Sequence, residues 1–133
     1  MIYLPPNDTL IEGTLKENIV FFNDVSDSTL YQTLRYCDLE SLVSRLSHGI
    51  DTNIGLKFKD LSSGEKRKIS LARVLVRVPR VLLLDEPTMH ISEDDKKNII
   101  ESLKTFQRNH GITMIIATHD KELYEIADKV ITL

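Results

Sequence analysis

Two adjacent carboxylates, Asp85 and Glu86, follow directly after the apolar run Val81 to Leu84. Such a run, without alternation of polar and apolar residues, is typical of a parallel strand that is buried on both faces. Open α/β sheets bind their ligands at the carboxyl ends of these strands. One carboxylate can hold Mg²⁺ or its waters while the other orients or deprotonates an attacking water, which indicates metal-assisted phosphoryl transfer. A strand followed by a polar turn is the simpler alternative.

The turn Ser62-Ser63-Gly64 could bind the phosphate on which such chemistry acts. Ser62 and Glu65 have the spacing of a capping box, in which the hydroxyl and the carboxylate satisfy amides at the start of a helix. The spacing therefore predicts a helix that begins here, and Pro79 limits its length. The free amides and the positive dipole end of its first turn would attract an anion, and Gly64 would let that anion approach the backbone closely.

A histidine, His119, follows the second predicted buried strand, Ile112 to Thr118. A histidine at the carboxyl end of a strand can donate a hydrogen bond to a phosphate or to an attacking water. Taken alone, a histidine in such a position is more often an ordinary turn residue. His119 is therefore a candidate site residue only in combination with Asp85 and Glu86.

The other elements that would position these residues are predicted from capping signals and apolar spacing. Ser92 and Asp95 predict a second capped start, for a helix that runs through Arg108 and stops at Gly111. Two short helices are expected within residues 26 to 47, with Ser26 or Asp27 as the first N-cap. A short helix is expected over Lys121 to Ala127, and strands over Met1 to Leu4 and Lys129 to Leu133.

Composition narrows the class of protein. A chain of 133 residues with 41% hydrophobic residues has the length of one domain and can form a modest core. A net charge of −3 argues against a nucleic-acid partner, and the basic run Lys66-Arg67-Lys68 is predicted to be the solvated face of a helix. The single cysteine, Cys37, excludes an intramolecular disulfide and fits a reducing, cytosolic setting. No stretch approaches the ~18 apolar residues that indicate a membrane span.

The stretch from Leu61 to Glu86 closely resembles the nucleotide-binding domain of ATP-binding-cassette (ABC) transporters. The family signature Leu-Ser-Gly-Gly-Gln appears here as Leu-Ser-Ser-Gly-Glu, and the Walker B strand corresponds to residues 81 to 86. Gly13-Thr14 and Glu17-Asn18-Ile19 are similar to the exporter form of the family. The resemblance implies an α/β fold with a P-loop-NTPase-like parallel sheet. Residues 20 to 78 would form a helical subdomain that carries the signature, and residues 1 to 19 and 79 to 133 the rest of the α/β core.

The resemblance also implies a function and roles for individual residues. It implies ATP binding and hydrolysis that power export, with Glu86 as general base, Asp85 as Mg²⁺ contact and His119 as γ-phosphate contact. Ser62, Ser63, Gly64 and Glu65 would hold the phosphate of an ATP bound by a second nucleotide-binding domain in a head-to-tail dimer. The other expected partner is a transmembrane domain, which would keep the chain at the cytoplasmic face of the membrane.

Four positions depart from the family pattern. Pro6 stands where the family has its Q-loop glutamine, Ser63 replaces a glycine, Glu65 replaces a glutamine, and Ser92 replaces the D-loop aspartate. A proline offers neither a side-chain donor nor an N–H. Glu65 brings a negative charge close to an expected phosphate. Each change is expected to weaken the site.

The phosphate-binding motif Gly-x-x-x-x-Gly-Lys-Ser/Thr, known as Walker A, does not occur in the chain, because none of the five glycines precedes a lysine. The sequence is therefore interpreted as the C-terminal portion of a larger ATPase domain, inactive by itself. The sheet would lack its Walker A strand, and the exposed strand edges are expected to favour self-association.

Three alternatives to an active exporter domain remain open. The first is a degenerate half of an asymmetric pair that binds ATP but turns it over slowly. The second is an ABC-type chromosome-maintenance or DNA-repair ATPase, against which the exporter-like Gly13-Thr14 stretch and the acidic composition argue. The third is a non-catalytic interaction module.

Overall fold

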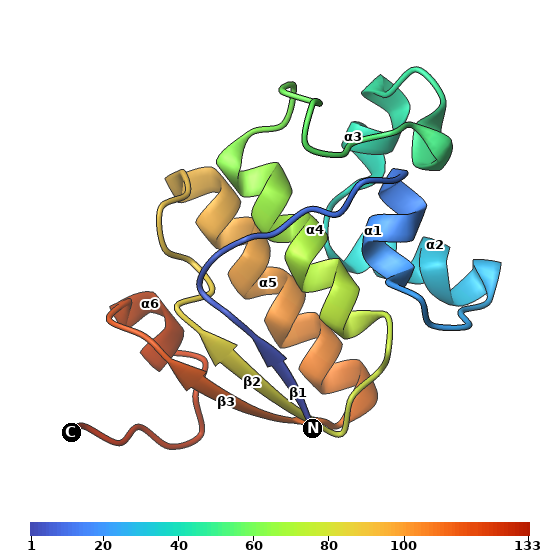
Figure 1. Ribbon diagram of the computed structural model, residues 1–133. Coiled ribbons are helices and arrows are strands. Elements are labelled where there is room, and N and C mark those ends of the chain that lie inside the picture. The colour runs from blue at the N-terminus through green and yellow to red at the C-terminus, as the bar shows by residue number, and fades with distance from the viewer.

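A three-stranded parallel sheet lies along one side of the computed structural model, which describes all residues from 1 to 133 (Figure 1). The strands are β1 (Ile2–Leu4), β2 (Val81–Asp85) and β3 (Thr113–Ala117), in the spatial order β1-β2-β3. The crossovers between them carry the helices, as parallel pairing requires. The α/β class and the parallel sheet predicted from the sequence are confirmed.

The strand register brings the carboxyl ends of β2 and β3 together. Asp85 pairs with Ala117, whereas β1 ends one residue earlier, where Leu4 pairs with Leu84. Glu86 continues the pairing through its amide, which donates to the carbonyl oxygen of Ala117 at 2.8 Å. The residues that follow both strands therefore lie at one edge of the sheet.

The helices begin at residues that cap their first turn. Ser26 caps α2 (Asp27–Tyr36), Ser62 caps α4 (Ser63–Leu75) and Ser92 caps α5 (Glu93–His110), as predicted. Gly111 ends α5 in the left-handed region at φ 61°. The remaining helices are α1 (Leu15–Val20), α3 (Glu40–Arg45), the 3-10 turn η1 (Gly49–Asp51) and α6 (Lys121–Tyr124).

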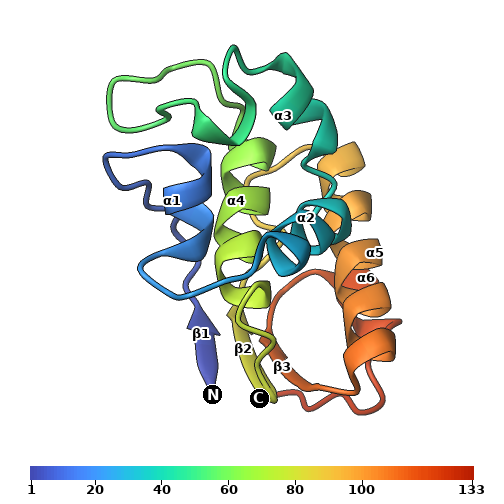
Figure 2. The same ribbon diagram turned by 90° about the vertical axis from the view of Figure 1, so that its right-hand side faces the viewer.

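Helices α4 and α5 run side by side over one face of the sheet, and α1, α2 and α3 gather around the far side of α4 (Figures 1 and 2). The buried face of β2 presents Leu82 and Leu84 to this layer. They join a core to which α4 contributes Ile69 and Leu75 and α5 contributes Phe106. Burial of these apolar side chains holds the signature helix against the sheet.

The prediction that β3 is buried on both faces is wrong. Ile115 is 57% exposed, and Thr113 and Ala117 on the same face are exposed too. On β1, Tyr3 points to this face and is 52% exposed. The helices cover only the opposite face of the sheet, so every second residue of β3 faces solvent. We call the surface formed by Tyr3, Leu83 and Ile115, which the register aligns in one row, the open face.

Residues 129 to 133 do not form the predicted final strand. Ile131 and Leu133 are exposed, and the segment takes no part in the sheet, although β3 is an edge strand with one unpaired side. An apolar run becomes a strand only when a neighbouring strand accepts its hydrogen bonds. The predicted helix over 121 to 127 is also shorter, since α6 ends at Tyr124.

No helix of the structure has both the length and the apolar character that crossing a bilayer requires.

Candidate functional site

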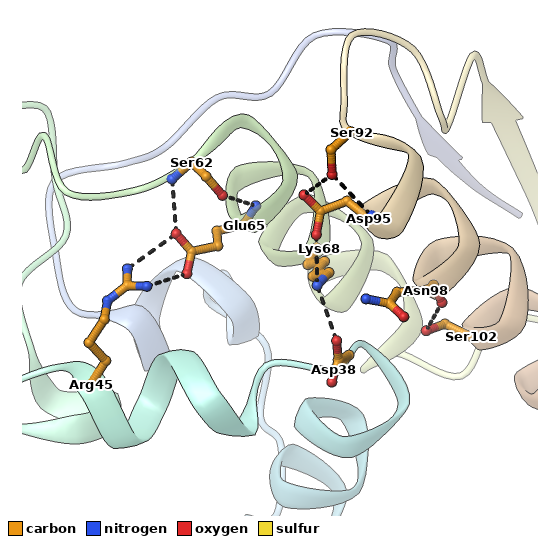
Figure 3. Close-up of polar contacts among 9 residues, drawn as sticks. All are labelled: Asp38, Arg45, Ser62, Glu65, Lys68, Ser92, Asp95, Asn98 and Ser102. Atoms are coloured by element: carbon orange, nitrogen blue, oxygen red, sulfur yellow. Dashed lines mark hydrogen bonds and ion pairs between the residues drawn. The ribbon is translucent and has the colours of Figure 1, made fainter.

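The predicted helix start at the signature turn is confirmed (Figure 3). The Ser62 hydroxyl accepts a hydrogen bond from the Glu65 amide at 3.1 Å, and the Glu65 carboxylate accepts one from the Ser62 amide at 2.9 Å. Ser62 and Ser63 are exposed, and the amides of Ser63 and Gly64 have no acceptor within the chain. The first turn of α4 therefore presents free amides at its positive dipole end.

The carboxylate of Glu65 is paired with Arg45, the last residue of α3, and so brings less negative charge to the turn than expected (Figure 3). Both terminal nitrogens of Arg45 donate to Glu65, at 2.9 and 3.1 Å. Burial raises the pKa of the Glu65 carboxyl, but the hydrogen bonds from Arg45 and Ser62 outweigh burial and hold that pKa below its ordinary value. No local sequence pattern predicts this pairing, because Arg45 lies twenty residues from Glu65.

Gly64 does not leave open space beside the helix, which differs from the expectation that an anion approaches there. A Cβ built on Gly64 would collide with the side chain of Asp95, in the first turn of α5. Gly64 is buried by this contact. The glycine therefore allows two helix starts to approach each other, and the surface left for an anion is formed by Ser62 and Ser63.

The prediction that Lys66-Arg67-Lys68 is a solvated face is wrong for two of its three residues. Arg67 is 1% exposed and Lys68 is 6% exposed, while Lys66 is on the surface. Lys68 lies between Asp38 and Asp95, at 3.2 and 3.1 Å from their carboxylates (Figure 3). Buried cations of this kind need close partners, which only the tertiary structure supplies.

The carboxylate of Glu86 lies directly beside His119. Its Oε1 is 2.6 Å from His119 Nδ1, and its Oε2 accepts hydrogen bonds from the Thr118 hydroxyl and the His119 amide at 3.2 and 3.4 Å. The His119 ring is fully exposed, whereas the Glu86 side chain is 19% exposed. The predicted neighbours Glu86 and His119 thus meet, and Thr118 is a contact that the sequence analysis did not single out.

The backbone and the protonation of Glu86 are both constrained. Glu86 has a left-handed φ of 48°, which is unusual for a residue other than glycine and is often found at functional sites. Burial raises the pKa of its carboxyl, but hydrogen bonds from His119 and Thr118 outweigh burial and keep that pKa below its ordinary value. The group is therefore a carboxylate at neutral pH, as an acceptor of protons must be.

Asp85 lies on the open face and accepts a hydrogen bond from the Tyr3 hydroxyl at 2.9 Å. No group of three or more His, Cys, Asp or Glu side chains in the chain could enclose a metal ion. Mg²⁺, however, keeps several waters and is usually held by one or two carboxylates together with substrate phosphates. A half-buried carboxylate at a strand end fits that requirement, so the residues are compatible with Mg²⁺ bound through Asp85 and a phosphate.

The loops after β2 and β3 are tied together beyond the carboxylates. The hydroxyl of Thr88 donates to Asp120 at 2.8 Å, and Lys96 of α5 approaches the same carboxylate at 3.4 Å. Asp120 also caps α6. These bonds hold His119, which directly precedes Asp120, close to Glu86. No motif in the sequence predicts these bonds, because the partners lie far apart along the chain.

A family model described as "ABC transporter" matches residues 3 to 89, more than half of the chain. The chain belongs to the ABC transporter family. The match covers the signature turn, helix α4 and the Walker B strand β2, and the expected resemblance to the nucleotide-binding domain of the family is thereby confirmed.

Curated members of the ABC family align with nearly the whole chain. It is 32% identical over 132 residues to the "Putative export ATP-binding/permease protein RC1073" of Rickettsia conorii, with 98% of this chain and 23% of that protein aligned. It is 33% identical to the "ATP-dependent permease MDL1" of Candida albicans, with 97% of this chain and 19% of that protein covered. It is 37% identical to the "ABC multidrug transporter mdr1" of Aspergillus fumigatus, with 90% and 9% covered.

The chain spans less than a quarter of the length of these relatives. Two of these relatives are named permeases and one a multidrug transporter.

Proposed function

We propose that this chain is the signature and Walker B part of an ATP-hydrolysing domain that powers export across a membrane. The observation that carries the proposal is the contact between Glu86 and His119, 2.6 Å apart at the ends of two neighbouring parallel strands. A base next to a hydrogen-bonding group, both at the carboxyl edge of an α/β sheet, can position an attacking water for phosphoryl transfer.

In this proposal Glu86 orients the attacking water and accepts its proton. The low pKa of its carboxyl supports a proton-free state at neutral pH. His119 turns its ring from Glu86 toward the γ-phosphate, which its full exposure allows. Asp85, which accepts a hydrogen bond from the Tyr3 hydroxyl in this structure, would hold Mg²⁺ or one of its waters. When bound, Mg²⁺ neutralises the charge that develops on the phosphate oxygens.

The signature turn acts on a different nucleotide in this proposal. Ser62 and Ser63 donate hydroxyl and amide hydrogen bonds to the phosphate of an ATP bound by a second nucleotide-binding domain in a head-to-tail dimer. Glu65 is neutralised by Arg45, and Gly64 keeps the turn against α5. The negative charge at position 65 is therefore a smaller obstacle to phosphate binding than the sequence suggests.

The remaining partner of the proposal is a transmembrane domain, which the word permease in the names of the relatives supports. The nucleotide-binding part would lie at the cytoplasmic face of that membrane. Nucleic acid has no part in the proposal, since the net charge is −3 and two of the clustered basic residues are buried in ion pairs.

The chain also offers surfaces for association with a second copy. Both β1 and β3 are edge strands, and Tyr3 and Ile115 expose apolar area on the open face. Unpaired strand edges bind other strands readily. We therefore include self-association of the isolated chain in the proposal.

A second candidate is a degenerate half of an asymmetric pair that binds ATP but hydrolyses it slowly. Pro6 favours it, because a proline cannot supply the amide side chain that contacts Mg²⁺ and water in the family. The first candidate requires ATP hydrolysis that depends on Glu86, whereas the second requires ATP binding with little hydrolysis. One experiment therefore separates them.

The test joins this chain to an upstream ABC segment that carries a Gly-x-x-x-x-Gly-Lys-Ser motif and measures ATP binding and phosphate release. We expect turnover that Glu86→Gln lowers by about 10²- to 10⁴-fold while ATP binding is kept. Glu101→Gln is the matched control, since Glu101 is an exposed glutamate in α5 that pairs with Lys104. ATP binding without turnover in the unaltered domain would favour the degenerate half. A joined domain that binds no ATP would overturn the proposal.

A further inference from the structure

Arg67 is buried between the ends of two strands. It lies in the second turn of α4, and its side chain is 1% exposed. It makes five hydrogen bonds, and all but one of the acceptors are backbone carbonyls. The acceptors are the carbonyl oxygens of Pro5, Asp85, Glu86 and Pro87 and the carboxylate of Asp8, at 2.8 to 3.3 Å.

The guanidinium group uses its whole donor capacity in this site. Nε donates to Pro87, Nη1 to Pro5 and Asp8, and Nη2 to Asp85 and Glu86. An arginine has five N–H donors in a planar fork, whereas a lysine has three on one nitrogen. Asp8 is the one carboxylate in contact with this buried charge, at 2.9 Å. The site is therefore matched to a guanidinium and not simply to a positive charge.

Arg67 donates hydrogen bonds to backbone carbonyls directly beyond the point where pairing between β1 and β2 ends. The last paired residues are Leu4 and Leu84. Beyond them come Pro5 and Pro6, which have no N–H to donate to a ladder. On the β2 side, Glu86 leaves the strand with a φ of 48°, and its amide bond to Ala117 anchors only the side facing β3. The carbonyls of residues 85 to 87 instead accept hydrogen bonds from Arg67.

We propose that Arg67 is a positioning residue that fixes the backbone of Glu86 and couples it to the segment Pro5 to Asp8. Movement of that segment shifts the guanidinium through Asp8 and Pro5, and the guanidinium shifts the carbonyls of Asp85 to Pro87. The side chain of Glu86 then changes its distance from His119 and Thr118. The importance of Glu86 rests on the proposed function. The coupling through Arg67 can be measured without nucleotide, so a failure of the coupling and a failure of the proposed function can be told apart.

A purely structural role for a buried arginine predicts uniform destabilisation, and site-specific amide hydrogen exchange separates this from positioning. The experiment compares this chain with its Arg67→Lys, Asp8→Asn and Arg73→Lys variants. Arg73 is the matched control, because it is a half-buried arginine of the same helix that donates to the Asn18 carbonyl and does not contact residues 85 to 87.

We expect Arg67→Lys to speed exchange of the Glu86 amide roughly tenfold or more relative to the amides within β2, because several charge-assisted bonds are lost. Asp8→Asn should shift the NMR signals of the Glu86 and His119 amides, although Asp8 contacts neither residue. That shift should be smaller in the Arg67→Lys background, as expected for a coupled pair. In Arg73→Lys, the exchange rate of the Glu86 amide should change only in proportion to the rates of the amides within β2.

Two results would overturn the proposal. One is exchange of the Glu86 amide in Arg67→Lys that rises only in proportion to that of β2. The other is an Asp8→Asn variant whose Glu86 and His119 signals are unchanged. Should Arg67→Lys fail to fold, the Asp8→Asn spectrum alone decides, because that variant keeps the guanidinium and its carbonyl contacts.

Discussion

The carboxylate of Asp95 occupies the space beside Gly64 that any larger residue at position 64 would need. This contact joins the first turn of α4 to the first turn of α5. Asp95 is held from two other sides, by the hydroxyl of Ser92 at 2.9 Å and by Lys68 at 3.1 Å. The start of the signature helix and the loop after the Walker B strand therefore have a common junction.

Gly64→Ala is expected to destabilise the chain by about 1–3 kcal/mol, because the new methyl group overpacks this junction. In an open helix the same change would stabilise by up to about 1 kcal/mol. Thermal or urea unfolding of Gly64→Ala, with and without Asp95→Ala, provides the test. We expect the cost of Gly64→Ala to disappear in the Asp95→Ala background. An equal cost in both backgrounds would show that Asp95 is not the obstacle.

Glu65→Gln should destabilise the chain at neutral pH and have little effect in acid. The folded state lowers the pKa of Glu65, so the carboxylate stabilises above its ordinary pKa of about 4.3, and this stabilisation is lost as pH falls through the folded value. We expect a loss of roughly 0.5–1 kcal/mol in the free energy of unfolding at pH 7, because the ion pair with Arg45 is removed. Urea unfolding at pH 7 and pH 3 measures this loss, with the exposed Glu40→Gln as control. Equal losses at both pH values would contradict the assignment.

Cys37 should be a probe of unfolding. Its side chain is 1% exposed in the core, and burial raises the pKa of the thiol far above its ordinary range. Because the thiolate is the reactive form, a thiol reagent should label Cys37 only when the chain opens. Labelling followed across a urea series should coincide with the loss of helix measured by circular dichroism. Rapid labelling without denaturant would mean that the core around α2 opens locally.

Ile115→Thr should weaken self-association without loss of fold. Ile115 is 57% exposed on the open face, and threonine is also well suited to strands. Light scattering over a range of concentrations should detect a larger species for the unaltered chain and less of it for the variant. Leu56→Thr, which removes a 77% exposed apolar side chain outside the sheet, is the control. A monomer at every concentration would contradict self-association through the sheet.

Several elements were predictable because their signals are local. Ser62 and Glu65 are three residues apart, so their spacing predicts the capping box that starts α4. Ser92 predicts the start of α5 in the same way. The apolar run before Asp85 predicted β2 for the same reason. The proximity of Glu86 and His119 followed from the resemblance, and the structure confirms that they touch. Their catalytic roles and that of the signature turn stay predictions.

Other features could not be predicted, since they depend on which segments meet. Lys129 to Leu133 has the composition of a strand, yet the folded chain does not pair it with the free edge of β1 or β3. Arg67 and Lys68 look like surface charges by sequence, yet the chain folds acceptors around both. The sequence predicts that Gly64 lets an anion approach the backbone, but the side chain of Asp95, from another helix, fills the space beside it.

The sequence by itself determined where α2, α4, α5 and β2 begin, the family of the chain and the identity of its candidate site residues, because capping, apolar runs and motifs act over a few neighbouring positions. Only the tertiary structure decided which charges are buried, which face of the sheet stays open and which groups hold Glu86. Those outcomes arise from contacts between residues as far apart as Pro5 and Arg67, where hydrogen bonding and exclusion of water depend on the folded path of the whole chain.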